Sequence, residues 1–177
     1  MRLFHFSDDS NIEVFVPRPV RVAAQRPPGL EWLNGPLVWA IDEAHQGMYL
    51  FPRDCPRILL WSTPETTQED YQHWWQGSDK KMLAYVEEGW LERIQGATLY
   101  RYEFPIEAFE NLEDAGMWVS RKAVKPIKFG KLTDLLNAQE VCNVELRVLD
   151  DLSPLKGVWD TSLHASGIRL RNAQNWH

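Results

Sequence analysis

Two polar side chains near the N-terminus, His5 and Ser7, have a spacing that suits ligand binding. Residues 2–6 (RLFHF) are predicted to form a strand, in which side chains two positions apart point to the same face, roughly 6 to 7 Å from each other. The pair would present a hydrogen-bond donor and an acceptor to one small ligand group. The structural alternative is that His5 bonds a neighbouring backbone group while Ser7 caps the turn at residues 7–11.

Charged residues occur in a second stretch, which runs from Asp42 to Arg57. Arg53 and Arg57 enclose the tripeptide DCP, and two guanidinium groups can bind a phosphate or a carboxylate in a forked geometry. The alternative is that the aspartates of this stretch, Asp42 and Asp54, pair with the arginines and fix the turn PRDCPR. The stretch therefore predicts either an anion site or a salt-bridged turn.

Two arginines near the C-terminus, Arg169 and Arg171, are also candidate ligand-binding residues. If this segment is a strand, alternation puts both on one face. The alternative is solvated charge, or pairing with the acidic excess of the chain. Trp39 lies in the apolar run at residues 37–41, just before Asp42, and its ring belongs either to the core or to the wall on which a flat heterocycle stacks.

Several chemistries are excluded by the motifs that the sequence lacks. The five histidines are scattered, without HxH or HExxH spacing, and Cys55 and Cys142 lie far apart, so we expect no metal and no disulfide scaffold. The absence of GxGxxG, of GxxxxGK[ST] and of GxSxG argues against Rossmann dehydrogenases, P-loop enzymes and α/β-hydrolases.

Length and composition describe a folded acidic protein. The 177 residues suit a single domain over residues 1–177, and 12% of them are aromatic, which is too many for a disordered acidic chain. The net charge of −6 makes nucleic acid an improbable partner. No apolar stretch approaches the roughly 18 residues of a membrane span, and residues 1–10 turn acidic where a signal peptide would be apolar. We therefore predict a cytoplasmic protein without membrane contact.

The elements that must position these residues follow from periodicity and turn signals. Extended segments are predicted at residues 2–6, 12–16, 37–41, 57–61, 97–104, 117–129 and 143–149. Helices are predicted at residues 43–51, 63–77, 78–96, 106–111, 132–139 and from residue 153 onward. Leu83, Val86, Trp90 and Ile94 support the helix at 78–96 by their intervals of three and four. The irregular order predicts an α+β fold, with a mixed or antiparallel sheet and flanking helices.

Five sequence blocks resemble an uncharacterised family of bacterial proteins: LFHFS, VWAIDE, LFPRDCPR, VELRV and IRLRNA. The resemblance covers about residues 2–173 and brings no established activity. More distantly, the layout is similar to the ADP-ribosyltransferase fold, in which a strand bearing a His precedes a strand with an aromatic residue and a helix. A later strand of that fold carries a catalytic Glu.

The second resemblance implies roles for particular residues. His5 would orient the ribose of NAD, with Ser7 beside it, and Trp39 would take the place of a Tyr that stacks on nicotinamide. Arg53 or Arg57 would lie near phosphate. Residues 117–120 (MWVS) offer no Glu to stabilise the oxocarbenium-like transition state, and Glu113 lies several residues too early. Ser120, the last residue of that segment, is a further ligand-binding candidate.

Two functions remain as hypotheses. One is an ADP-ribosyltransferase-like domain that binds NAD or a related nucleotide. The alternative is a non-catalytic binding module, in which PRDCPR and the arginines of IRLRN recognise an anionic metabolite or a protein partner. Recognition of nucleic acid through the basic C-terminus is disfavoured by the net charge.

Overall fold

The computed structural model describes residues 1–177, and its internal contacts divide the chain into two units. Unit 1 comprises Met1–Gln46 and Leu99–Lys131, and unit 2 comprises Gly47–Thr98 and Leu132–His177. Each unit contains its own sheet, and helices lie between the strands in an irregular order along the chain. The predicted α+β class is therefore confirmed. A single domain over residues 1–177 stays a prediction.

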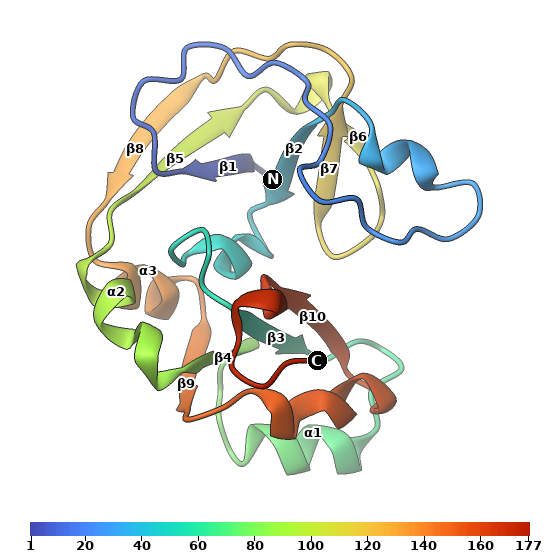
Figure 1. The fold of residues 1–177 in the computed structure, drawn as a ribbon, viewed down its shortest axis with the longest axis vertical. Coiled ribbons are helices and arrows are strands. Elements are labelled where there is room, and N and C mark those ends of the chain that lie inside the picture. The colour runs from blue at the N-terminus through green and yellow to red at the C-terminus, as the bar shows by residue number, and fades with distance from the viewer. The chain divides into compact units, whose positions relative to one another are not determined.

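Unit 1 is built on a six-stranded sheet with the order β6-β7-β2-β1-β5-β8 (Figure 1). The strands are β1 (Leu3–Ser7), β2 (Val38–Asp42), β5 (Leu99–Phe104), β6 (Glu110–Asn111), β7 (Met117–Ser120) and β8 (Lys128–Leu132). β1 pairs antiparallel with both β2 and β5, and β2 pairs antiparallel with β7. The predicted strand at 12–16 is reduced to one bridge, between Phe15 and Val124.

The two faces of this sheet bury different apolar clusters. One cluster contains Leu3, Phe15, Val38, Ala40, Tyr102, Phe104, Phe109 and Val124. The other contains Leu33, Leu37 and Val119, with Trp32, Trp39 and Leu112 packed against it. Successive residues of β2 thus alternate between the clusters, as the pleat of a strand requires.

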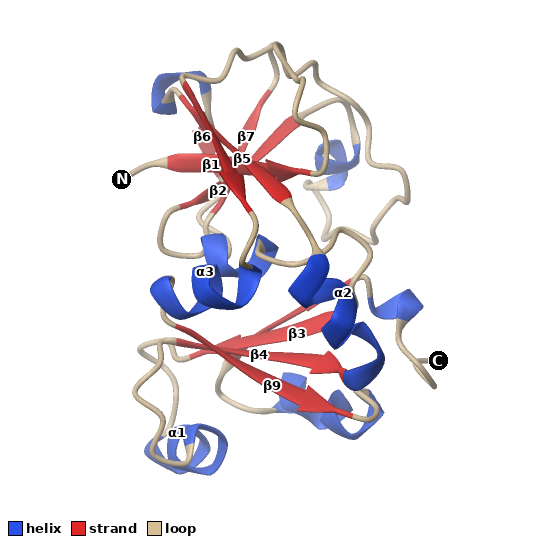
Figure 2. Cartoon of the chain, turned by 90° about the vertical axis from the view of Figure 1, so that its left-hand side faces the viewer, coloured by secondary structure: helices blue, strands red, loops and turns tan.

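Unit 2 is built on a four-stranded sheet with the order β10-β3-β4-β9. The strands are β3 (Arg57–Trp61), β4 (Met82–Glu87), β9 (Val144–Leu149) and β10 (His164–Ile168). The pair β4 and β9 is parallel and the other pairs are antiparallel. Figure 2 shows helices α2 (Leu91–Gly96) and α3 (Leu135–Val141) on one side of this sheet and α1 (Gln68–Trp75) on the other.

Short 3-10 helices complete the secondary structure. They are η1 (Glu31–Asn34), η2 (Gln46–Tyr49), η3 (Glu88–Trp90), η4 (Ile106–Ala108), η5 (Ser153–Asp160) and η6 (Leu170–Asn172). The helix predicted at 43–51 is therefore only the single turn η2. The helix predicted from residue 153 exists as η5, and its Leu155 and Val158 are buried as its periodicity indicates. No helix of the structure has the length and apolarity that crossing a membrane requires.

The helix predicted over residues 78–96 is wrong in its first half. Residues 82–87 form β4, all six of whose residues are buried, and the chain turns helical only at residues 88–96. The spacing of Leu83 and Val86 suits a helix, but a central strand buried on both faces gives the same apolar run. Pairing with β3 on one side and β9 on the other decides in favour of the strand.

Helix α1 begins four residues later than its proline signal predicts. Thr67 is the N-cap, and its side chain accepts a hydrogen bond from the backbone N–H of Asp70 at 3.2 Å. Thr63, the predicted cap, instead takes part in a turn with Thr66, whose N–H bonds the Thr63 carbonyl. The helix ends at Trp75, and its C-cap, Gln76, lies in the left-handed region with φ of 50°.

Candidate functional site

His5 stabilises the sheet of unit 1. Its Nδ1 lies 2.9 Å from the carbonyl oxygen of Trp39, and because a carbonyl only accepts, Nδ1 is the donor. The last paired residues of β1 and β2 are Phe4 and Ile41. The His5 side chain therefore bonds a carbonyl of β2 that lies just past the paired part of the two strands. Its ring packs on Phe15, with ring centroids 4.9 Å apart. This is the backbone contact that the structural alternative predicts.

Ser7 and Ser120 also bond backbone groups close to them in sequence. The buried Oγ of Ser7 accepts a hydrogen bond from the Asp9 N–H at 3.1 Å. Ser120 Oγ donates to the Lys122 carbonyl and accepts from the Lys122 N–H, both at 3.2 Å. Both hydroxyls thus fix turns.

Trp39 does not share a ligand site with His5. Trp39 belongs to the cluster of Leu33, Leu37 and Val119, whereas the His5 ring packs among the residues of the opposite face. Its Nε1 is buried without a hydrogen-bond partner, and the Arg26 guanidinium lies 5.7 Å from its ring centroid. The arrangement that the ADP-ribosyltransferase resemblance implies, with both side chains on one nucleotide, is therefore not present.

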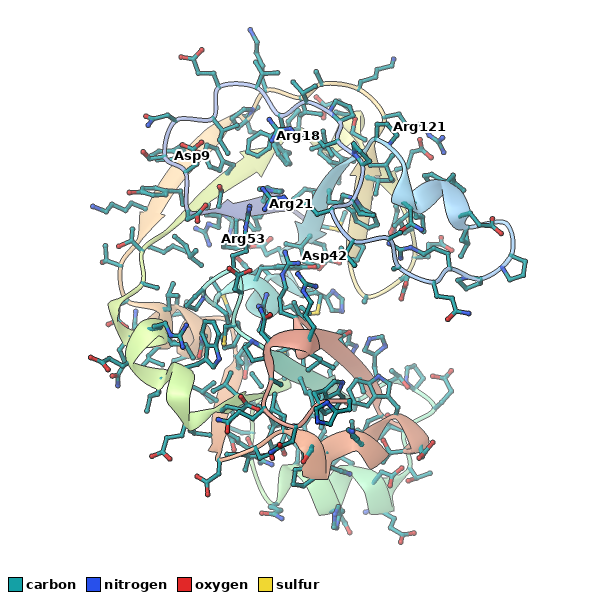
Figure 3. The ribbon with its side chains drawn as sticks, in the orientation of Figure 1. Asp9, Arg18, Arg21, Asp42, Arg53 and Arg121 are labelled. Atoms are coloured by element: carbon teal, nitrogen blue, oxygen red, sulfur yellow. The ribbon has the colours of Figure 1, made fainter.

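Asp42, which is labelled in Figure 3, lies at the end of β2. It binds a histidine rather than an arginine. Its Oδ1 accepts from the backbone N–H of His45 at 2.8 Å and lies 2.7 Å from His45 Nδ1. Gly116 packs against both side chains, and its carbonyl accepts from the Asp42 N–H at 2.9 Å. Sequence reasoning missed this pair. The Asp and His three residues apart after a strand are the signal that could have identified it.

Arg57 is the buried cation of unit 2. Only 2% of the residue is exposed, because β3 places it between Val86 of β4 and Ile168 of β10. Its Nε donates to the Met48 carbonyl and its Nη1 to the Cys55 carbonyl, both at 2.9 Å. The turn PRDCPR is therefore fixed by an arginine on carbonyl groups. The predicted pairing of arginine with aspartate is wrong here, since no ion pair joins them.

No carboxylate balances the charge of Arg57. The guanidinium lies 5.8 Å from the ring centroid of Tyr49 and 5.1 Å from that of Phe51. Burial lowers the pKa of Arg57 to about 10, so the group stays charged at neutral pH. Cys55 and Tyr49 raise this pKa, whereas the charge of Arg169 lowers it further. An uncompensated charge in such surroundings is costly.

The third nitrogen of the Arg57 guanidinium, Nη2, differs from the other two. Nη2 makes no hydrogen bond, yet it is not among the side-chain atoms that are both buried and unpaired, which are Trp39 Nε1 and Gln139 Oε1. Nη2 is therefore not fully enclosed, although only 2% of the residue as a whole is exposed.

Arg169 supplies a second positive charge near Arg57. Its charge influences the pKa of both Arg57 and the half-buried Tyr49, whose pKa is raised by burial. Its Nε donates to the Arg53 carbonyl at 3.3 Å, and its backbone is left-handed, with φ of 55°. We call Tyr49, Arg57 and Arg169 the Arg57 cluster. Tyr49 is a member that sequence reasoning missed.

Arg53 and Arg171 are exposed. Arg169 is followed by η6, so no strand puts it on one face with Arg171, and that expectation is wrong. Arg53 carries the carbonyl that Arg169 bonds, and the amide of Asn172 donates to the Asp54 carbonyl at 2.7 Å. The C-terminal segment therefore holds the PRDCPR turn in place.

The thiol of Cys55 should be unreactive in the folded protein. Burial raises its pKa to about 11, whereas Cys142 is only half-buried. Because the thiolate is the reactive species, a disulfide reagent at pH 8 should titrate Cys142 alone, and both thiols after denaturation. In a Cys142→Ser variant the native protein should show no rapid reaction. Fast labelling of that variant would contradict the burial of Cys55.

Comparison with known proteins gives a family but no activity. No curated protein matches the chain, and no solved structure matches it. The model of a family of unknown function, DUF6886, matches residues 4–173, which is nearly the whole chain. The chain therefore belongs to this family of unknown function, DUF6886.

Proposed function

We propose that this protein binds an anionic metabolite that carries phosphate groups, through the Arg57 cluster. The observation that carries the proposal is the buried guanidinium of Arg57, which has two carbonyl partners and no carboxylate. A bound anion would supply the missing negative charge. It would also accept from Nη2, the nitrogen that makes no hydrogen bond within the protein.

A phosphate group suits the cluster better than a single carboxylate. The positive charges of Arg57 and Arg169 attract a phosphate more strongly than a singly charged carboxylate, and guanidinium binds phosphate oxygens in a forked geometry. The rings of Tyr49 and Phe51 beside Arg57 lower the local dielectric and strengthen the attraction. Diphosphates, which carry more charge, should therefore bind more tightly than inorganic phosphate.

NAD and ADP-ribose belong to this class of ligand because both contain a diphosphate. A protein that works like an ADP-ribosyltransferase would bind NAD through His5 and Trp39. In this chain the two side chains lie on opposite faces of their sheet. The geometry supports anion binding by the Arg57 cluster better than transfer chemistry at His5. We therefore propose the ligand class without a reaction.

Calorimetric titration and thermal unfolding test this proposal. The ligands are inorganic phosphate, pyrophosphate, ADP-ribose, NAD and citrate, with sulfate at equal ionic strength as the control. A ligand at about 100 times its Kd should add about 2.7 kcal/mol to the free energy of unfolding. We expect pyrophosphate and ADP-ribose to raise Tm above the sulfate control. No heat and no shift of Tm at millimolar diphosphate would refute the proposal.

A further inference from the structure

Strand β8 forms an open edge of the sheet in unit 1. It lies at the end of the strand order beside β5, as Figure 1 shows. On the side facing away from β5, residues 128–131 make no backbone hydrogen bond to another segment. An edge of this kind offers N–H and C=O groups to which another extended chain can bond.

The segment that contains this edge is strongly basic. Residues 121–131 include Arg121 and four lysines and no acidic residue, in a chain whose net charge is −6. Arg121 pairs with Glu110 at 3.0 Å. The lysines differ from it, because all four are exposed and none takes part in an ion pair; they are Lys122, Lys125, Lys128 and Lys131.

Apolar side chains accompany the charge at the same edge. Ile127 is 60% exposed and Phe129 is 53% exposed. Phe129 is held in place nevertheless, because its ring stacks on Tyr100 with centroids 5.5 Å apart and an interplanar angle of 9°. The edge therefore presents a fixed aromatic ring, with Lys131 on the same face of the strand and Lys128 on the opposite face.

We propose that β8 accepts an acidic, extended peptide segment of a partner protein as an additional strand. The unpaired N–H and C=O groups of the edge favour an extended segment that can bond them as a strand. The lysines, which have no ion-pair partner, favour acidic side chains in that segment. The same lysines oppose a second copy of β8, since like charges on adjacent strands repel. Nucleic acid would leave the backbone groups of the edge unused, and the net charge of the chain opposes it.

The register of the edge defines the peptide pattern. An antiparallel partner strand meets Lys131 first, Phe129 two residues later and Lys128 one residue after that. Residues directly opposite each other on adjacent strands interact most strongly. The matching pattern is therefore acidic, any residue, apolar, acidic, as in Glu-Ser-Val-Glu.

The test measures binding of a labelled peptide containing Glu-Ser-Val-Glu by fluorescence anisotropy, and the amide shifts of residues 128–131 by NMR. The charge-reversed variant Lys128→Glu, Lys131→Glu should bind this peptide at least tenfold more weakly and should bind a Lys-Ser-Val-Lys peptide instead. The control variant Lys81→Glu, Lys156→Glu changes the net charge equally outside β8. It should bind within twofold of the wild type, and circular dichroism confirms that each variant is folded.

Four results would overturn the proposal. A scrambled peptide of the same composition that binds equally well would mean attraction without strand pairing, as would undiminished binding of a peptide whose backbone amides are methylated. Tighter binding of single-stranded oligonucleotide than of the acidic peptide would assign the edge to nucleic acid. Self-association that the charge reversal abolishes, measured by sedimentation, would assign it to a second copy of this chain.

Discussion

Replacing Arg57 by Met should abolish the stabilisation of the protein by pyrophosphate and leave the chain folded. A hydrogen bond from a charged group contributes about 1.5 to 3 kcal/mol, so the loss of the guanidinium should weaken binding at least tenfold. Met fills much of the same volume, and it removes a buried charge that has no carboxylate partner. The measurement is the rise in Tm with pyrophosphate, compared between variant and wild type.

The control for this experiment removes a positive charge elsewhere in unit 2. Lys81 is exposed and directly precedes Met82, the residue of β4 that pairs with Trp61, whereas Arg57 begins β3 at the opposite end of that strand pair. Lys81→Gln should therefore keep wild-type affinity for pyrophosphate. If Arg57→Met also binds within twofold of the wild type, the Arg57 cluster is not the site.

Arg57→Lys separates charge from geometry. An ammonium group keeps the positive charge, but it cannot bond two carbonyl oxygens and an anion with the planar fork of a guanidinium. We expect weaker pyrophosphate binding than in the wild type. We also expect a loss of about 1 to 3 kcal/mol in the free energy of unfolding, because the carbonyl of Met48 or of Cys55 loses its partner. Chemical denaturation without ligand measures this loss.

The sequence identifies Arg57 as a candidate, but its burial depends on pairing across the sheet. Charge and spacing in PRDCPR suggest two equivalent arginines, and the structure makes Arg53 exposed and Arg57 buried. The difference arises because Arg57 is the first residue of β3, between β4 and β10, and β10 lies more than 100 residues later in the chain. No local pattern contains that information.

The prediction of secondary structure succeeded where local signals were unambiguous. The apolar runs at 37–41 and 57–61 are strands β2 and β3 within one residue, and the alternation at 97–104 is β5. It failed at β4, because a run of buried residues fits a helix and a central strand equally well. The partner that settles β4 as a strand is β9, some 60 residues away, and a parallel pair requires such a crossover.

Gly116→Ala should destabilise the protein by about 2 to 4 kcal/mol, because a left-handed backbone and an overpacked contact each cost on the order of 1 to 2 kcal/mol. Gly116 has a φ of +74°, a conformation that strains any residue with a Cβ. A Cβ there would also lie 2.7 Å from Asp42 Oδ1 and closer still to His45 Nδ1. Both atoms belong to the hydrogen bond that follows β2, so neither can move without weakening it.

A second glycine separates the two causes. Gly29 has a φ of +87°, and a Cβ built on it meets no atom within 4 Å. Gly29→Ala should therefore show the backbone strain alone, about 1 kcal/mol. The excess in Gly116→Ala then measures the contact with Asp42 and His45, and the NMR signals of the His45 ring should shift in that variant only. Equal losses of stability in the two variants, with unchanged His45 signals, would show that the region around Gly116 relaxes and that the close packing of this glycine is not required.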